Sequence, residues 1–356
     1  MKIVTIIGAR PQFIKAGTLS REIAKHKSIE EVIIHTGQHF DDNMSEIFFN
    51  QMRIPKPKYN LNINGNGHGA MTGQMLEKIE IVLKKEQPDW VVVYGDTNST
   101  LAGALAASKL HIKIAHIEAG LRSFNIKMPE EVNRILTDRI SDVLFCPTEI
   151  AINNLKKEGF PNIIANNYKQ VVINVGDVMQ DGAIYYEGLA DKPNTKLKNK
   201  FVLTTIHRAE NTDDIYRLTS IFQALSEISL KTQVILPVHP RTKEIILKNK
   251  LNIENITLID PVGYLEMIWL IKNCTQILTD SGGLQKEAYF FKKPCITLRD
   301  ETEWTELTDH KFNILAGAKK ENIIEAFNNF EFNKDFSIDL FGGGNASAKI
   351  IETLLR

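Results

Sequence analysis

The sequence has no excess of charge of either sign: 43 lysines and arginines are matched by 43 aspartates and glutamates in 356 residues. Because the net charge is zero, any affinity for phosphate must come from local groups. We therefore do not expect nucleic acid or an anionic membrane surface as a partner. No apolar run approaches the roughly 20 residues that a membrane-spanning helix needs. The apolar start at Met1–Gly8 is too short for a signal peptide. We therefore expect a cytoplasmic protein.

Cysteine is also scarce, with Cys146, Cys274 and Cys295 far apart in the chain. Their number is odd and no CxxC spacing occurs, so neither a disulfide framework nor a zinc site is indicated. We expect reduced thiols that serve as small core residues. Repeats and low-complexity tracts are absent as well.

What the chain does contain is a regular alternation of short β-branched runs and amphipathic stretches, which is typical of parallel βαβ units. The runs are nearly continuous in valine and isoleucine, as in strands that helices cover on both faces. The predicted strands are Lys2–Ile7, Glu31–His35, Trp90–Tyr94, Ile114–Glu118, Val143–Cys146, Val171–Val175, Phe201–Thr205, Val234–Val238, Ile256–Ile259, Ile277–Thr279 and Cys295–Leu298.

The length suggests two domains of ordinary size, and the polar stretch Glu187–Lys200 separates two series of strands. We predict an α/β fold of two Rossmann-like, doubly wound domains facing across a cleft. The first domain covers residues 1–176 and the second covers 177–344. A final helix at Ala346–Leu355, with Asn345 as a possible cap, follows Gly342–Gly344 and crosses back to complete the first domain with residues 345–356.

The clearest ligand motif is Thr279–Glu287, TDSGGLQKE, which follows a predicted strand. Ser281 can cap the next helix, while Gly282 and Gly283 let backbone N–H groups approach a phosphate closely. Glu287, further along that helix, can accept hydrogen bonds from both ribose hydroxyls of a nucleotide. The alternative is an ordinary capped helix whose glycines serve packing.

A second strand end, Gly8–Lys15, places Arg10 and Lys15 near a helix N-terminus, where anions are favoured. Because Gly8 is its only glycine, the motif is not GxGxxG and argues against a dinucleotide cofactor. Solvated surface charge is the competing interpretation of Arg10 and Lys15.

Three carboxylates are candidates for acid and base chemistry. Glu118 ends a strand in apolar surroundings, which raise a carboxyl pKa, whereas Glu130 follows Pro129 at a helix N-terminus, which favours the charged form. Acids in such opposed environments suit proton transfer. Asp96 lies at a neighbouring strand end, although it could be only a helix cap. Surface salt bridges to Arg122 and Arg134 are the alternative for the two glutamates.

Two histidine–arginine pairs follow successive strands of the second domain: His207 with Arg208, and His239 with Arg241. Two such pairs in succession indicate anion handling. A metal site is not indicated, because neither His35 with His39 nor His116 with Glu118 brings a third convergent ligand.

Taken together, the motifs GARPQFIK, YGDTNST, HIEAGLRS, MPEEVNR, HRAEN and TDSGGLQKE, in this order, resemble the non-hydrolysing UDP-N-acetylglucosamine 2-epimerase family over essentially the whole chain. The resemblance implies a glycosyltransferase-B-type arrangement and a homodimer. It also implies inversion at C2 of a UDP-2-acetamido sugar by elimination and re-addition of UDP, with no NAD or metal. By the same resemblance, Asp96, Glu118, Glu130 and His207 are catalytic; Arg10, Lys15, Met267, Ser281, Gly282, Gly283 and Glu287 bind UDP; and Gln38, His39, Arg122, Arg134, Arg208, His239 and Arg241 are candidates for the sugar.

Two departures bear on the substrate. Asp41 stands where better-known members carry a glutamine that helps to bind an activating substrate molecule, and Glu301–Glu306 replaces their TTERPE. These segments look more like the branch that epimerises UDP-2,3-diacetamido-2,3-dideoxyglucuronate for bacterial surface polysaccharide, whose carboxylate Arg122, Arg208 or Arg241 could pair with. The alternatives are a hydrolysing 2-epimerase that releases UDP and free sugar, a glycosyltransferase, and a non-catalytic nucleotide-sugar-binding protein.

Overall fold

The computed structural model describes residues 1–38, 49, 52–65, 67–161, 170–238 and 240–356, with only the backbone described for Arg10 and Arg241. The chain forms two compact units, one of Met1–Ile184 with Asp339–Arg356 and one of Tyr185–Ile338. The division falls within α7 (Val178–Glu187), whereas the sequence analysis placed it after Gly176. No helix among the described residues combines the length and the apolar composition that crossing a membrane requires.

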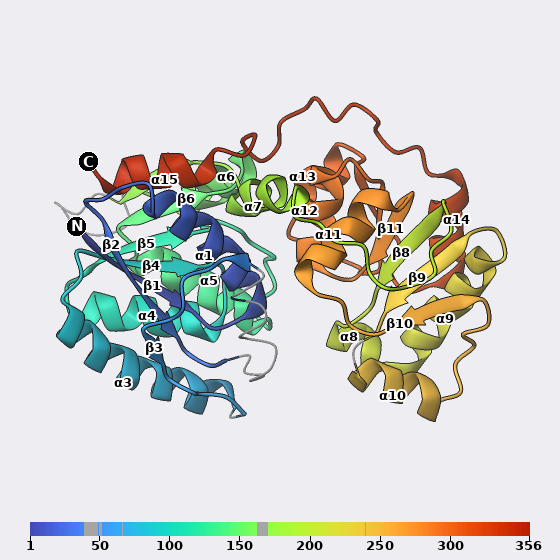
Figure 1. Cartoon of the computed structure of the whole chain (residues 1–356), viewed down its shortest axis with the longest axis horizontal. Helices are drawn as coiled ribbons and strands as arrows, with labels where there is room; N and C mark the ends of the chain where they lie inside the picture. The colour runs from blue at the N-terminus through green and yellow to red at the C-terminus, as the bar shows by residue number, and fades with distance from the viewer. Residues whose placement is uncertain (39–48, 50–51, 66, 162–169, 239) are drawn as a thin grey trace. The chain divides into compact units, whose positions relative to one another are not determined.

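The first unit is built on a parallel sheet, shown in blue to green in Figure 1. Within the described residues its strands have the order β3-β2-β1-β4-β5-β6-β7. Helix α4 packs on β1 and β4, where Ile6, Val93 and Ala102 share one buried cluster. The strands are β1 (Lys2–Ile7), β2 (Glu30–His35), β3 (Tyr59–Asn60), β4 (Trp90–Tyr94), β5 (Lys113–Ile117), β6 (Val143–Cys146) and β7 (Val171–Asn174), and the helices besides α7 are α1 (Arg10–Ile23), α3 (His68–Glu86), α4 (Asn98–Lys109), α5 (Pro129–Ile140), α6 (Glu149–Lys157) and α15 (Ala346–Leu354).

The second unit repeats this plan with a parallel sheet of order β10-β9-β8-β11-β12-β13. Its central strands are buried, and helix α9 packs on β9 through Leu218, Phe222 and Leu225. The strands are β8 (Phe201–Thr205), β9 (Gln233–Pro237), β10 (Ile256–Ile259), β11 (Gln276–Thr279), β12 (Cys295–Thr297) and β13 (Asn313–Leu315), and the helices are α8 (Ala209–Thr212), α9 (Ile215–Ser229), α10 (Pro240–Lys248), α11 (Tyr264–Asn273), α12 (Gly282–Phe290), α13 (Thr305–Asp309) and α14 (Lys320–Asn329). Both sheets are covered by helices, which confirms the predicted fold class of two Rossmann-like units.

Each sheet has one point where the strand order reverses. In the first unit β1 pairs with β2 on one side and β4 on the other, and in the second β8 pairs with β9 and β11. Open α/β sheets bind ligands outside the carboxyl ends of the strands at such a point. The turns that follow β1 and β4, and those that follow β8 and β11, are therefore candidate ligand-binding positions.

The last helix belongs to the first unit, as Figure 1 shows, and packs against α1. Asn345 occupies the N-cap position, but its side chain makes no capping hydrogen bond. The cap comes instead from Asp181 of α7, whose carboxylate accepts hydrogen bonds from Ala346 N at 3.1 Å and from Ser347 N and Oγ at 2.8 Å. Asn345 therefore holds the predicted N-cap position, but the capping hydrogen bonds come from a residue that is distant in sequence.

All eleven predicted strands are found within one residue of their predicted ends. Two strands were not predicted, β3 and β13, which have only two and three residues and lie at the sheet edges. Glu118, which was predicted to be the last residue of a strand, lies just after β5 with φ +70°. It therefore belongs to the turn, where a side chain can face a ligand.

Candidate active site

The turns after β1 and β4 are tied together by the side chain of Gln12. Its Oε1 accepts hydrogen bonds from Gly8 N at 2.8 Å and Ala9 N at 3.0 Å. Its Nε2 donates to Tyr94 O at 2.8 Å and Thr100 Oγ1 at 2.9 Å. One buried amide thus holds both turns at the reversal point. Gln12 was not among the predicted site residues, although a polar residue close to the start of an apolar helix was a signal.

Gly8 is needed because other groups approach its backbone closely. A Cβ atom there would lie 2.1 Å from Ser99 Oγ and 2.2 Å from Thr36 Oγ1. Ser99 in turn donates to Gln38 Oε1, from Oγ at 2.8 Å and from N at 3.1 Å. Gln38, a predicted sugar contact, therefore lies at the N-terminus of α4.

Asp96 follows Gly95, which has φ +61°, and is not a helix cap. The cap of α4 is Thr97, whose Oγ1 accepts from Thr100 N, so the N-cap interpretation of Asp96 was wrong. The Asp96 carboxylate instead accepts two hydrogen bonds from Arg134 of α5, at 2.6 and 3.0 Å. Burial raises the pKa of Asp96 and the charge of Glu118 adds to this, while Arg134 and Lys15 oppose it. Such a carboxyl suits proton transfer.

Glu118 forms a buried ion pair with Lys15 of α1, whose side chain is 7% exposed against 10% for the glutamate. Its backbone N donates to Phe145 O at 3.0 Å, which fixes the turn in the left-handed region. A Cβ atom at Gly95 would lie 3.0 Å from the Glu118 carboxylate and 3.4 Å from Lys15 Nζ. The structure thus places Lys15, predicted to bind UDP, beside the two candidate catalytic acids Asp96 and Glu118.

Helix α5 begins at Pro129, as predicted, with Glu130 and Glu131 in its first turn. Glu131 is buried and accepts from Ser123 N, Phe124 N and Arg134. Burial alone would raise the pKa of Glu131, but these donors lower it. Glu131 therefore serves to hold the turn and Arg134 in place. Glu130 is half-buried, and its carboxylate makes no hydrogen bond or ion pair with any described residue.

Behind these turns lies a fully buried polar network centred on Asp138. His116 contacts it through Nδ1 at 2.7 Å and Gly95 O through Nε2 at 2.7 Å, so neither ring nitrogen faces Glu118. Arg122, predicted as a sugar contact, pairs with Asp138 at 2.8 Å and Glu158 at 2.6 Å. Its side chain is 1% exposed, so the structure places it in the interior and not at a ligand surface. Despite the cost of burial, His116 and Arg122 lower the pKa of Asp138.

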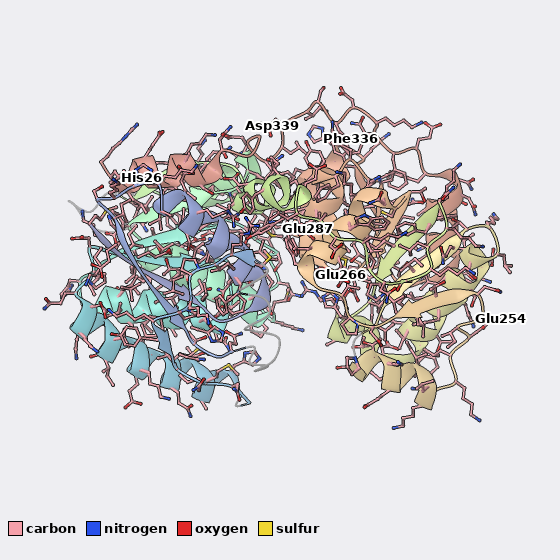
Figure 2. All side chains as sticks on the ribbon, in the orientation of Figure 1. His26, Glu254, Glu266, Glu287, Phe336 and Asp339 are labelled. Atoms are coloured by element: carbon pink, nitrogen blue, oxygen red, sulfur yellow. The ribbon has the colours of Figure 1, made fainter. Side chains whose placement is uncertain are left out.

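In the second unit, the turn after β11 has the predicted capping geometry. Ser281 is the N-cap of α12 and its Oγ accepts from Leu284 N at 3.4 Å. A Cβ atom at Gly282 would lie 2.3 Å from a Glu303 carboxylate oxygen, so a larger residue there would require the Glu303 side chain to move. Glu287 lies on α12 (Figure 2), is buried, and accepts from Tyr264 Oη at 2.9 Å. Met267 lies on α11 and is partly buried against the apolar cluster that includes Leu284.

The turn after β8 carries His207 and Arg208 beside Asp280, which the sequence analysis did not assign. Asp280 is fully buried and accepts from the backbone N of both residues. His207 Nδ1 lies 3.4 Å from Asp280 Oδ1, and the His207 side chain is 52% exposed. Asp280 could have been identified from the sequence, because it belongs to the TDSGG motif and directly follows a predicted strand.

Four predicted site residues are wholly or partly outside the described residues: His39 and His239 entirely, and Arg10 and Arg241 in their side chains. Asp41, which bears on the substrate, also lies outside them. Arg208 is half-buried at the N-cap position of α8.

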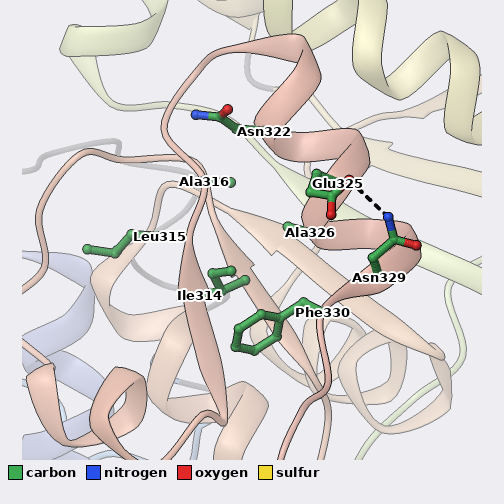
Figure 3. Close-up of a pocket in the computed structure, with 8 residues that line it drawn as sticks. All are labelled: Ile314, Leu315, Ala316, Asn322, Glu325, Ala326, Asn329 and Phe330. Atoms are coloured by element: carbon green, nitrogen blue, oxygen red, sulfur yellow. Dashed lines mark hydrogen bonds between the residues drawn. The ribbon is translucent and has the colours of Figure 1, made fainter.

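A cavity of about 320 Å³ lies elsewhere, between β13 and α14, and contains none of the predicted site residues. Figure 3 shows that its one titratable side chain, Glu325, points toward Asn329, which donates to it at 2.9 Å. The cavity is otherwise mainly apolar and is not where the candidate chemistry lies. Its lining residues are Ile314, Leu315, Ala316, Asn322, Glu325, Ala326, Asn329 and Phe330.

Solved structures share this fold over the whole chain. That of Methanocaldococcus jannaschii UDP-GlcNAc 2-epimerase in complex with UDP-GlcNAc and UDP has a TM-score of 0.89 at 45% identity, covering 100% of this chain and 99% of that one. That of the Neisseria meningitidis enzyme bound to UDP-GlcNAc has a TM-score of 0.85 at 32% identity, covering both chains fully. Fold and sites therefore define an enzyme of the class that these structures represent.

The sequence relationships agree. The model of the family described as UDP-N-acetylglucosamine 2-epimerase matches residues 21–355, and the chain belongs to this family. The UDP-2,3-diacetamido-2,3-dideoxy-D-glucuronate 2-epimerase of Pseudomonas aeruginosa is 57% identical over 360 residues, covering 100% of both chains. A UDP-N-acetylglucosamine 2-epimerase homolog of Methanococcus maripaludis is 54% identical, covering 99% of both.

Proposed function

We propose that this protein inverts C2 of a UDP-2-acetamido sugar by eliminating UDP and adding it back. The observation that carries the proposal is the juxtaposition of Asp96, Glu118 and Lys15 at the reversal point of the first sheet, within a chain that belongs to a 2-epimerase family. Asp96 is 32% exposed and pairs with Arg134, whereas Glu118 is 10% exposed and pairs with Lys15. Burial raises the pKa of Asp96, although Arg134 and Lys15 oppose the rise. Two neighbouring acids that differ in exposure and in cationic partner suit proton transfer.

The reaction follows from the chemistry of the substrate. The C2 proton beside an acetamido group is too weakly acidic for direct removal, so the C1–O bond breaks first and UDP leaves with the electron pair. Loss of the C2 proton to a carboxylate then gives an unsaturated sugar. Re-addition joins a phosphate oxygen of UDP to C1, and a proton is delivered to the opposite face of C2. Asp96, Glu118 and Glu130 handle the proton and the cationic character at C1.

The second unit binds UDP in this proposal. The N-terminus of α12, capped by Ser281 and open at Gly282 and Gly283, favours the diphosphate because the helix dipole and N–H groups attract anions. Glu287 accepts from the ribose hydroxyls and His207 acts at the departing oxygen. Arg10, Lys15 and Met267 complete the assignment to UDP, and Gln38, His39, Arg208, His239 and Arg241 remain candidates for the sugar.

We further propose UDP-2,3-diacetamido-2,3-dideoxyglucuronate as the substrate and bacterial surface polysaccharide as the destination of the product. Support comes from the 57% identity to the Pseudomonas aeruginosa enzyme and from Glu301–Glu306, which departs from TTERPE. A free arginine would pair with the sugar carboxylate. Since Arg122 is already paired inside the protein, Arg208 and Arg241 are the better candidates.

The test is proton NMR of the purified protein in D2O with this substrate and, separately, with UDP-N-acetylglucosamine. We expect exchange of the C2 proton and formation of the manno isomer without free sugar. Stoichiometric release of UDP and free sugar would instead indicate a hydrolysing 2-epimerase, and turnover only with an acceptor sugar a glycosyltransferase. The variant Glu118→Gln should lose turnover by a factor on the order of 10²–10⁴ while retaining UDP binding. Glu149→Gln, which changes an exposed carboxylate of the same unit, should retain both.

A homodimer in the cytoplasm is also proposed. The first unit exposes apolar side chains on α5 and just before it, with Phe124 76%, Ile126 66% and Leu136 47% exposed. Exposed apolar side chains favour association, and three unpaired cysteines suit a reducing compartment. Light scattering after size exclusion should give twice the chain mass for the wild type and a lower mass for Leu136→Glu.

A further inference from the structure

Asp280 holds an unusually complete set of hydrogen bonds for a buried carboxylate that carries no assigned role. It accepts from His207 N at 3.0 and 3.1 Å, from Arg208 N at 3.0 Å and from Asn211 Nδ2 at 3.2 Å. Its side chain is 0% exposed. Donors on the turn after β8 therefore keep the carboxylate in one orientation, against the imidazole of His207.

Of the two imidazole nitrogens, Nδ1 is the one that lies at ion-pair distance from this carboxylate. Nδ1 of His207 lies 3.4 Å from Asp280 Oδ1, while about half of the His207 side chain is exposed. In a neutral imidazole only one nitrogen carries a proton, and the partner of the ring decides which. An acceptor-only carboxylate beside Nδ1 favours the proton on that nitrogen.

We propose that Asp280 is a positioning residue that fixes the Nδ1–H tautomer of His207 and so makes Nε2 the nitrogen that acts on the leaving phosphate oxygen. The catalytic consequence rests on the proposed function. When the C1–O bond breaks, the imidazolium donates its Nε2 proton toward the departing oxygen and is left neutral with Nδ1–H facing Asp280. Re-addition of the phosphate oxygen to C1 returns the proton to Nε2.

A chain of hydrogen bonds that begins at Asp300 and runs through Arg217 and Asn211 holds Asp280 in its orientation. Asn211 donates to Leu298 O at 2.9 Å as well as to Asp280, and its Oδ1 accepts from Arg217 Nε at 3.1 Å. Arg217 in turn pairs with Asp300 at 2.8 Å. Because Asn211 is anchored on both sides of its amide, its Nδ2 is held toward Asp280. Rigid support of this kind is what keeps a catalytic side chain in its productive geometry.

The test reads the tautomer directly. The full-length protein is labelled with ¹⁵N-histidine, and the two ring-nitrogen shifts of His207 are assigned among the nine histidines by their loss in His207→Gln. At a pH where the ring is neutral, we expect protonated Nδ1 and unprotonated Nε2 in the wild type. Asp280→Asn should shift the population toward the Nε2–H form, whereas Asp213→Asn, the same change on an exposed aspartate of that segment, should not. An Nε2–H tautomer in the wild type would overturn the proposal.

Kinetic constants of the Asp280→Asn variant then distinguish a positioning role of Asp280 from a role in folding. In Asp280→Asn we expect kcat to fall by a factor on the order of 10², the contribution of a correctly protonated catalytic group, with KM changed only a few-fold. If Asp280→Asn fails to fold, the wild-type shifts still decide the matter, and Asn211→Ala should give a smaller loss of kcat. A wild-type Nδ1–H tautomer together with no turnover of any UDP-sugar would reject the proposed function and leave the role of Asp280 in setting the tautomer intact.

Discussion

Arg134 donates two hydrogen bonds to one oxygen of the Asp96 carboxylate, at 2.6 Å from Nη2 and at 3.0 Å from Nε. A third donor of the same guanidinium reaches Glu131 at 2.6 Å. Arg134 was a candidate for the sugar, yet the structure shows it as the partner of a candidate catalytic acid. It thereby fixes Asp96 with respect to α5, the helix that also carries Glu130.

Loss of this arginine should be costly. Arg134→Met leaves Asp96 and the buried Glu131 without their cation, and we expect the free energy of unfolding to fall by about 3 kcal/mol. Urea denaturation measures this against Arg139→Met on the same helix, since Arg139 is 38% exposed and lies 3.9 Å from Glu158. An exposed pair contributes less than about 1 kcal/mol. Equal losses in the two variants would contradict the assignment.

The hydrogen bonds that Asp181 accepts from the start of α15 should contribute to the stability of the protein and to the pH dependence of that stability. Asp181→Ala removes three hydrogen bonds from the start of α15 and should cost about 1–2 kcal/mol by urea denaturation. Burial raises the pKa of Asp181, Asp177 adds to this, and the donors Ser347 and Ala346 oppose it. The folded state therefore retains a proton that the unfolded chain has released, and stability falls as pH rises from the usual aspartate pKa through the raised one. Asp181→Asn should abolish this fall in stability with rising pH. If the fall persists in the variant, another group causes it.

Two helical glycines should respond to alanine in opposite directions. Gly73 in α3 is exposed, and a Cβ atom there would meet nothing within 4 Å. Gly73→Ala should therefore stabilise the protein by about 0.5–1 kcal/mol, because alanine restricts the unfolded chain more than glycine does. In α4, a Cβ atom at Gly103 would lie 2.6 Å from Ile6 Cδ1 and 3.2 Å from Val93 Cγ1, so Gly103→Ala should cost about 1–3 kcal/mol. Thermal unfolding of the two variants checks the difference in sign.

The cysteines should be inert in the folded protein. All three are buried and unpaired, and burial raises the pKa of Cys146 and Cys295 and that of Cys274 to about 12. Because the thiolate is the reactive form, a disulfide reagent at pH 8 should label none of them in the native protein and all three in urea. Rapid labelling of one of these cysteines in the native protein would show that the structure around it opens and exposes the thiol.

Local sequence was sufficient for the ends of five strands, namely β1, β4, β6, β8 and β10. Four of them, β1, β4, β6 and β8, are buried at every position or at all but the first, and such strands are nearly continuous in apolar residues. The edge strands β3 and β13 carry no such run. The reversal of the chain at Glu118 was also missed, since its left-handed φ depends on the backbone bond to Phe145 O from the neighbouring strand.

The sequence by itself determined the alternating architecture, the buried cysteines and the capped glycine turn at Ser281, because period, propensity and capping act over a few neighbouring residues. Only the tertiary structure decided which charges meet. Arg122 pairs inside the protein with Asp138 and Glu158, and Lys15 pairs with Glu118 more than a hundred residues away. The same residue types occur at many positions, and their partners depend on how strand ends are brought together by the order of the sheet.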